Sequence, residues 1–300
     1  MNQQTFHIPS STSNLGAGFD ALSLALSCHL TVSIEASAEF AIEATGISAL
    51  SIPLGPDNLI LRVARRVAAQ RGWRLPPFRM VISNEIPVAR GLGSSAAAIV
   101  AGITCYELAT RDRLTDEEIF RYAFEFESHP DNLAASLYGG LISAATSSNG
   151  SALVAKLEVA AGVAPVVVIP DFELSTEKAR AVLPQSYSKM DAIFNIQRSA
   201  LIIAALTTGK WNLLRQAMED RIHQPYRTPL IPGLKEILEL KHAGLFGIAL
   251  SGAGPTVMAF ADPGAADSVG KAIAGCFAAN GVTSTPHQLG IDCRGRVIDL

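Results

Sequence analysis

The chain has few charged residues and few cysteines. It also has no long basic run and no long apolar run, which are typical of nucleic-acid-binding and membrane proteins respectively. Charged residues make up 17 % and hydrophobic residues 49 % of its 300 residues, which excludes a disordered chain, since disorder needs the opposite balance. No long run of lysine and arginine occurs, the densest cluster being Arg62, Arg65 and Arg66, and the formal net charge is −3. We therefore expect no nucleic-acid partner. No uncharged apolar stretch of about 18 residues occurs, so we expect no membrane span.

Cysteine is also scarce: Cys28, Cys105, Cys276 and Cys293 lie far apart along the chain. Without a Cys-x-x-Cys pair, neither a zinc site nor a redox pair is expected. The first ten residues hold no positive region followed by an apolar stretch, so they do not predict a signal peptide. Together these features predict a protein of the reducing cytoplasm.

Strand and helix patterns alternate along the first half. Leu30, Val32 and Ile34 alternate with polar residues, which predicts a half-buried strand. Residues 94–108 are apolar on almost every side and predict a helix that is buried on most sides. Composition marks no domain boundary, and the order of segments places one near residue 160.

The most informative stretch is a glycine-rich loop that opens this apolar helix. Gly91 and Gly93 let the backbone turn sharply and approach a ligand, and Ser94 and Ser95 follow in the first helical turn. Unpaired backbone N–H groups and the positive end of the helix dipole meet there, which predicts a phosphate-binding site. It is not a Walker A loop, because the chain has no Gly-x-x-x-x-Gly-Lys-Ser/Thr. In the alternative interpretation, Ser94 only caps the helix.

Two further segments combine glycine with polar residues. Residues 9–20, PSSTSNLGAGFD, predict a polar loop after a short strand. The alternative is a surface loop in which Asn14 and Asp20 form local turns. Residues 251–256, SGAGPT, lie between two apolar strands and predict a hairpin-like turn.

These three segments resemble, in the same order, the three motifs of the GHMP kinases. The nucleotide-binding motif of that family is similar to residues 87–97, Pro-x-x-x-Gly-Leu-Gly-Ser-Ser-Ala-Ala. The resemblance implies an enzyme that phosphorylates a small hydroxylated molecule with ATP and Mg²⁺. It implies an α+β fold in which residues 1–160 resemble the second domain of ribosomal protein S5 and residues 161–300 are ferredoxin-like. Family habit implies a homodimer.

The resemblance also assigns a nucleotide and metal site. The residues it places against ATP are Asn58, Pro87, Arg90, Gly91, Leu92, Gly93, Ser94, Ser95, Ala96, Gly252 and Gly254. Ser95 and Glu127 would hold Mg²⁺, which prefers carboxylates, hydroxyls and phosphate oxygens. Glu125 is a rival for the metal, and Glu127 is preferred only by the resemblance. Asn58 equally suits a helix cap.

The acceptor is indicated by residues 127–132, ESHPDN, which resemble the signature of the family branch that phosphorylates homoserine. The resemblance places His129 and Asn132 beside the acceptor hydroxyl and makes Ser95, Glu127 and Asn132 the catalytic set. The residues implied to bind the acceptor are Asn14, Asp20, His129, Thr176, Arg180 and Arg227.

The chemistry of three of these residues suits an amino acid. An aspartate such as Asp20 can hold an ammonium by a charge-assisted hydrogen bond. The guanidinium groups of Arg180 and Arg227 suit a carboxylate better than a lysine does. The alternative for each arginine is a surface salt bridge. Ser128 and the Thr228-Pro229 pair depart from the pattern of the branch.

The resemblance therefore implies transfer of the ATP γ-phosphoryl group to the hydroxyl of L-homoserine, giving O-phospho-L-homoserine for threonine biosynthesis. No residue is assigned as a general base. Two alternatives stay open at this point. One is a GHMP kinase with another acceptor such as mevalonate, which has no ammonium for Asp20 to bind. The other is a small-molecule sensor that kept the fold and lost turnover.

Overall fold

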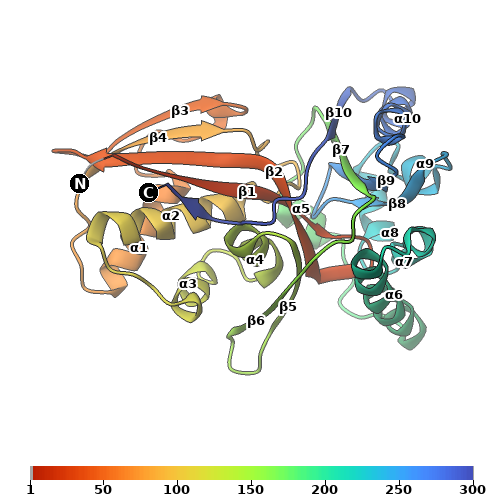
Figure 1. Ribbon diagram of the computed structural model, residues 1–300, viewed down its shortest axis with the longest axis horizontal. Helices are drawn as coiled ribbons and strands as arrows, with labels where there is room; N and C mark the ends of the chain where they lie inside the picture. The colour runs from red at the N-terminus through yellow and green to blue at the C-terminus, as the bar shows by residue number, and fades with distance from the viewer. Residues whose placement is uncertain (1–2, 300) are drawn as a thin grey trace.

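The computed structural model describes residues 3–299, which form two units side by side along the longest axis (Figure 1). The first unit is a seven-stranded sheet with helices α1 to α4 gathered against one face. Its elements are β1 (Gln4–Asn14), β2 (Gly18–Ala36), β3 (Ala41–Gly46), the 3-10 helix η1 (Ala49–Ser51), α1 (Leu59–Gln70), β4 (Phe78–Asn84), α2 (Ser94–Thr110), α3 (Asp116–Ala123), α4 (Pro130–Tyr138), β5 (Leu141–Thr146), β6 (Ala152–Leu157) and β11 (Val297–Ile298).

The sheet of the first unit is organised by the 19-residue strand β2. The main order is β11-β1-β2-β4-β3, and β5 pairs with another part of β2 and with β6. Leu30, Val32 and Ile34 of β2 are buried, which confirms the predicted half-buried strand. Helix α3 begins with a capping box, in which Thr115 is the N-cap and Glu118 its partner, and the helix ends at Ala123.

The polar segment at residues 9–20 is strand, turn and strand rather than the loop that its composition predicted. β1 and β2 leave only a short turn between them, and the polar side chains of residues 10–14 are buried. Ser11 Oγ donates to Asn132 Oδ1 at 2.8 Å, and Thr12 Oγ1 accepts from Ser251 Oγ at 2.8 Å. Partners that are distant in sequence satisfy the hydrogen bonds of these buried groups. The segment can therefore be buried although its side chains are polar.

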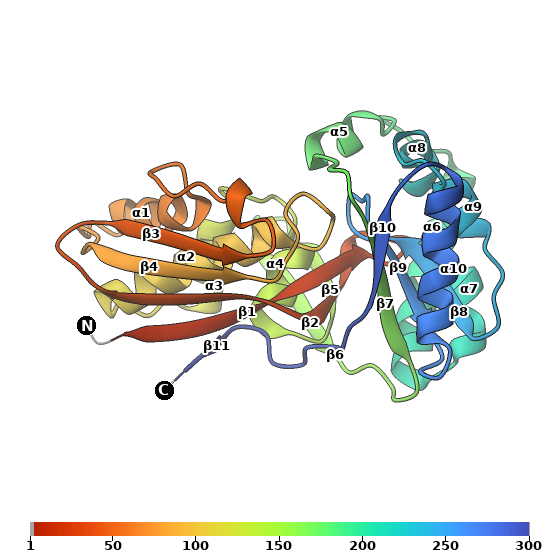
Figure 2. The same cartoon turned by 90° about the horizontal axis from the view of Figure 1, so that it is seen from above.

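The second unit is a four-stranded antiparallel sheet of order β10-β7-β9-β8. Read along the chain, its strands and helices follow the β-α-β-β-α-β pattern of ferredoxin-like folds, as expected. Its elements are β7 (Ala164–Pro170), α5 (Thr176–Ala181), α6 (Lys189–Thr208), η2 (Trp211–Leu213), α7 (Leu214–Ala217), α8 (Gln224–Arg227), η3 (Thr228–Leu230), α9 (Leu234–Glu239), β8 (Leu245–Leu250), β9 (Val257–Ala261), α10 (Ala266–Ala279) and β10 (Ser284–Gln288). Figure 2 shows α10 lying along this sheet, where it packs on β7 and β10.

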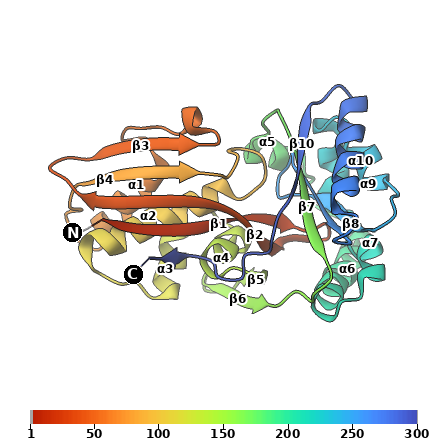
Figure 3. The same ribbon diagram turned by 45° about the horizontal axis from the view of Figure 1, so that its top comes forward.

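After β10 the chain returns to the first unit (Figure 3). Ile291 bridges to Leu26 of β2, and β11 pairs antiparallel with β1 through Ile298 and Phe6. The last residues described therefore extend the first sheet, which the division into 1–160 and 161–300 did not foresee. That division stays a prediction.

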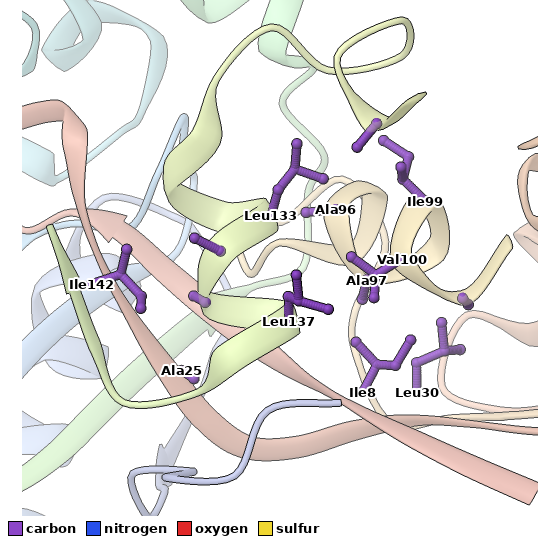
Figure 4. Close-up of a cluster of buried hydrophobic side chains, with 14 of the residues drawn as sticks. Ile8, Ala25, Leu30, Ala96, Ala97, Ile99, Val100, Leu133, Leu137 and Ile142 are labelled. Atoms are coloured by element: carbon purple, nitrogen blue, oxygen red, sulfur yellow. The ribbon is translucent and has the colours of Figure 1, made fainter. Parts of the chain in front are cut away.

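Helix α2 lies in the middle of the first unit and packs beside α4 on the sheet (Figure 4). Ala97 and Val100 of α2 are buried next to Leu133 of α4 and Ile8 of β1, as expected for a helix that is apolar all round. Within residues 3–299 no helix is long and apolar enough to cross a membrane. Because α2 is enclosed along its length, its N-terminus opens from the protein interior.

Candidate active site

The N-terminus of α2 is shaped by the glycine-rich loop. Gly93 is the N-cap, with φ 72° and no side-chain cap, so the interpretation of Ser94 as a helix cap is wrong. Gly91 also has a positive φ, 78°. A Cβ atom on Gly91 would collide with the carbonyl oxygen of Ser251, and one on Gly93 with the hydroxyl of Ser11. The tight loop leaves the first N–H groups of α2 without a side-chain partner, as an anion site requires.

A cavity of 130 Å³ lies in front of this helix end and receives residues from all three glycine-containing motifs. The predicted site residues that line it are Asn14, Asp20, Pro87, Arg90, Gly91, Leu92, Gly93, Ser94, Ser95, Ala96, Glu127, His129, Asn132, Thr176, Arg180, Arg227 and Gly252. A second cavity, of 390 Å³, is lined by the two remaining predicted residues, Asn58 and Gly254. The two cavities share lining residues at the start of α2, Ser94 and Ser95 among them.

The second cavity has mainly apolar walls, to which Ile52, Leu59 and Ile82 contribute. Asn58 lines it and also caps α1: its Oδ1 accepts from Leu61 N at 3.3 Å, and its Nδ2 donates to a backbone carbonyl at 2.8 Å. The helix-cap interpretation of Asn58 is therefore confirmed. A pocket of this kind, beside a helix N-terminus that suits an anion, suits a flat and mostly apolar ring.

Arg90 supplies a positive charge beside the glycine loop. Its Nη2 donates to the carbonyl oxygen of Asp171 at 3.2 Å. Its Nη1 is buried and finds no partner among residues 3–299. A buried cationic donor without a partner is costly, so this nitrogen favours an anion in the cavity.

Opposite charges meet at the other end of the first cavity. Arg180 donates two hydrogen bonds to Asp20, at 2.7 and 3.2 Å, and His129 Nε2 lies 3.6 Å from Asp20 Oδ2. His129 Nδ1 is 2.7 Å from Glu127 Oε1, and this hydrogen bond raises the pKa of His129. Burial is the largest single influence and opposes the charge of Arg180, but its hydrogen bonds to Asp20 and the nearby carboxylate charges together raise its pKa. Arg180 Nε is buried with no partner in the described chain.

Arg227 lies deeper, with 1 % of its surface exposed. Its Nε donates to the Ala179 carbonyl at 3.1 Å, and its Nη1 donates to His223 Nδ1 and the Gly252 carbonyl at 3.1 and 3.0 Å. Burial and the charge of Arg180 lower the pKa of Arg227 to about 10, so it is still cationic at neutral pH. Since it forms no salt bridge with any described carboxylate, the surface salt-bridge interpretation is wrong for this arginine.

Two asparagines connect the motifs. Asn14 Nδ2 donates to the carbonyl of Gly252 at 2.8 Å, and its Oδ1 accepts from the backbone N–H of Asp20 at 3.0 Å. Asn14 is buried, so the alternative of a surface loop is wrong for this residue; its side chain bonds across the β1–β2 turn and to the second unit. The amide of Asn132 lies between two serine hydroxyls of β1, at 2.8 and 3.0 Å. Both side chains are held in fixed positions at the cavity wall.

Sequence reasoning gave Asp131 no role, although it lies inside the ESHPDN string. Its side chain lines the first cavity and is 1 % exposed. Burial raises the pKa of Asp131 to about 7, and the charges of Asp20 and Glu127 act in the same direction. Only the neighbouring polar residues could have drawn attention to it.

Candidate metal ligands are few. Glu127 lines the first cavity, whereas the carboxylate of its rival Glu125 is held by Arg66 and Gln70, at 2.6 and 2.7 Å. Across residues 3–299 no group of three or more His, Cys, Asp and Glu side chains gathers as a metal site. A cation bound at Ser95 and Glu127 would therefore complete its coordination with ligand or solvent oxygens.

Two family models match this chain. The family model of the GHMP kinase N-terminal domain matches residues 58–140, and that of the GHMP kinase C-terminal domain matches residues 202–279. A homoserine kinase of Solibacter usitatus is 44 % identical over 97 % of this chain and 96 % of its own length. A homoserine kinase of Moorella thermoacetica is 41 % identical, covering 97 % and 98 %.

Solved structures agree in fold. The crystal structure of homoserine kinase from Cytophaga hutchinsonii superposes with a TM-score of 0.85 at 25 % identity, covering 100 % of this chain and 98 % of that one. Galactokinase of Lactococcus lactis, at 13 % identity and a TM-score of 0.72 over 99 % and 95 % of the two chains, shares the fold alone. The predicted α+β fold class is confirmed.

Proposed function

The chain belongs to the GHMP kinase family, and from that premise we propose that it is an ATP-dependent homoserine kinase. It transfers the γ-phosphoryl group of ATP to the side-chain hydroxyl of L-homoserine and forms O-phospho-L-homoserine for threonine biosynthesis. One observation carries the choice of acceptor. A single cavity places the carboxylate of Asp20 and the guanidinium groups of Arg180 and Arg227 beside a phosphate-binding helix end. This charge pattern is complementary to an amino-acid zwitterion.

The nucleotide would lie across both cavities. Its phosphates suit the N-terminus of α2, where backbone N–H groups, the helix dipole and the unpaired Nη1 of Arg90 all favour negative charge. Its base suits the apolar cavity near Asn58. The cavities share Ser94 and Ser95, so a ligand in both would bend around the first turn of this helix.

The donor set fits a magnesium ion. The Ser95 hydroxyl and the Glu127 carboxylate both line the cavity, and hydroxyl, carboxylate and phosphate oxygens are hard ligands of the kind that Mg²⁺ prefers. Bound there, Mg²⁺ would neutralise charge on the phosphates as it grows during transfer. The hydrogen bond that Glu127 accepts from His129 orients the carboxylate.

The acceptor would exchange one ion pair for two. Asp20 and Arg180 bind each other directly at the cavity wall. An amino acid would offer its ammonium to Asp20 and its carboxylate to Arg180. Arg227 supplies further positive charge on the carboxylate side. Thr176 lines the same cavity and can donate or accept a hydrogen bond.

Phosphoryl transfer requires mainly positioning and charge neutralisation. The acceptor hydroxyl oxygen forms a bond to the γ-phosphorus as the bond to the β,γ-bridging oxygen breaks, and ADP leaves with that electron pair. His129 and Asn132 lie at the wall where this hydroxyl would be held. The hydroxyl proton passes to phosphate or solvent, and no side chain is assigned as its acceptor.

The test is an ATP-consumption assay with homoserine, threonine, serine and mevalonate side by side. We expect homoserine to give the highest kcat/KM. Preference for mevalonate, which has no ammonium, would favour the alternative acceptor class and leave Asp20 without its role. No phosphate transfer to any hydroxylated compound would favour the silent sensor. The cytoplasmic location and the homodimer stay predictions.

A further inference from the structure

His223 is a fully buried histidine that lines neither cavity, although it contacts a residue that does. It precedes α8 and lies between the turn of the β1–β2 hairpin and Arg227. Its Nε2 is 2.8 Å from the carbonyl oxygen of Gly16, and its Nδ1 is 3.1 Å from Arg227 Nη1. The contact with Gly16 joins the second unit to the first, and the contact with Arg227 connects His223 to the wall of the first cavity.

The two contacts determine where the ring carries its proton. A guanidinium nitrogen can only donate, so His223 Nδ1 must be the acceptor of the bond from Arg227. A carbonyl oxygen can only accept, so Nε2 must carry the hydrogen that is donated to Gly16. The ring is therefore neutral. Burial and the charge of Arg227 lower the pKa of His223, although the nearby Asp220 acts in the opposite direction. The lowered pKa keeps the ring neutral.

The surroundings keep the ring at a fixed angle. The Phe19 ring is stacked on it, with 5.1 Å between centroids and 21° between planes. The same Phe19 ring also lies under the guanidinium groups of Arg180 and Arg227, at 5.5 and 5.4 Å. The buried Asp220 carboxylate also lies beside the ring, 3.6 Å from His223 Nε2. It accepts hydrogen bonds from the backbone N–H groups of residues 222–224.

We propose that His223 is a positioning residue for the acceptor: in its Nε2–H form it accepts the hydrogen bond that orients Arg227 toward the acceptor carboxylate. The proposal rests on the proposed function, because it takes the acceptor to carry a carboxylate. Two backbone carbonyls fix the other Arg227 hydrogen bonds, so His223 is the one side chain among residues 3–299 that accepts from it. The direction of the guanidinium then depends on this bond.

Two substitutions separate positioning from packing. In His223→Asn the side-chain oxygen can replace Nδ1 as acceptor for Arg227, whereas His223→Gln keeps a donor for Gly16 in place of Nε2 and loses that acceptor. We expect the Gln variant to raise the KM for homoserine about tenfold, with kcat and the KM for ATP within about twofold of the wild type. The Asn variant should keep the KM for homoserine within about threefold. His287→Gln, an exposed histidine on β10, is the matched control and should change nothing.

A substrate without the carboxylate supplies the second measurement. The wild-type enzyme should discriminate strongly between homoserine and 3-aminopropan-1-ol, and His223→Gln should shrink that ratio about tenfold while His223→Asn preserves it. Equal losses in both variants, or a fall in kcat for both substrates alike, would overturn the proposal and leave His223 as packing only. If the wild-type enzyme does not phosphorylate homoserine at all, the proposed function fails first.

A spectroscopic measurement on the wild-type protein needs no variant. Nitrogen-15 NMR of the histidine rings should show His223 neutral, with Nε2 protonated and Nδ1 bare. A ring protonated on Nδ1, or charged at pH 7, could not accept from Arg227 and would end the proposal even if both variants failed to fold.

Discussion

The Asp20 carboxylate accepts two hydrogen bonds from the Arg180 guanidinium, at 2.7 and 3.2 Å, although 160 residues separate them along the chain. This pair joins the start of β2 in the first unit to α5 in the second. Each group is the natural partner for one end of a zwitterion. Acceptor binding and the contact between the two units are therefore coupled at this point.

Replacing Asp20 by Asn should weaken acceptor binding and spare nucleotide binding. The neutral amide loses a charge-assisted bond of about 1.5–3 kcal/mol, which corresponds to an increase in the KM for homoserine of roughly 10- to 150-fold. The KM for ATP should stay within about twofold. Asp267→Asn, which removes an exposed carboxylate paired with Lys271 on α10, should leave both constants unchanged. Equal increases in both KM values would contradict the role given to Asp20.

Replacing Ser95 by Ala should lower turnover far more than stability. Gly93, not a serine, is the N-cap of α2, so no helix cap is removed. We expect kcat to fall by tenfold or more, on the order of one lost metal ligand, with the melting temperature almost unchanged. Ser188→Ala is the opposite control, since Ser188 accepts from Asp191 N at 3.1 Å as the N-cap of α6. That variant should lose about 1 kcal/mol of stability and keep its activity.

Replacing Glu127 by Gln should raise the Mg²⁺ concentration needed for half-maximal rate, since an amide binds a hard cation less well than a carboxylate does. An increase on the order of tenfold is expected. Glu125→Gln, which removes the salt bridge to Arg66 and changes the contact with Gln70, should leave the magnesium dependence unchanged. The reverse result, in which Glu125 alone matters, would transfer the metal role to the rival carboxylate.

The buried Asp131 should make the protein less stable as pH rises. Its pKa is raised to about 7 in the folded protein, above its ordinary value near 4, so between about pH 4 and 7 the folded state holds one proton more than the unfolded state. The free energy of unfolding therefore falls across that window, by at most about 4 kcal/mol. Asp131→Asn should remove this fall and be the more stable form at pH 8. A wild-type stability that rises with pH through the window, and a variant that flattens it, would show Asp131 ionised.

Much of the fold follows from local patterns. The alternation of Leu30, Val32 and Ile34 predicts a half-buried strand, and the apolar run of α2 predicts a buried helix. Both predictions are confirmed. The polar second half of β1 was predicted as loop because its buried hydroxyls are satisfied by Asn132 and Ser251, which lie far along the chain. Long-range hydrogen bonds of this kind leave no periodic signal in the sequence.

The candidate site divides in the same way. The glycine loop and the ESHPDN string have compact signatures, and every residue assigned from them or from the related motifs lines one of the two adjoining cavities. The burial of those residues and their hydrogen-bond partners could not be predicted. That Arg227 is buried and bound to His223, and that Asp131 is enclosed, depends on how α8 and α4 pack, which no short motif records.

The pairing of β11 with β1 affects how the protein is made. Residues near position 6 leave the ribosome long before residues near position 298, so the outer edge of the first sheet stays uncovered through almost all of synthesis. An uncovered edge can pair with another nascent chain. We therefore expect aggregation to increase when ribosomes crowd on one messenger. Deleting β11 should also increase aggregation, although the strand has only two residues.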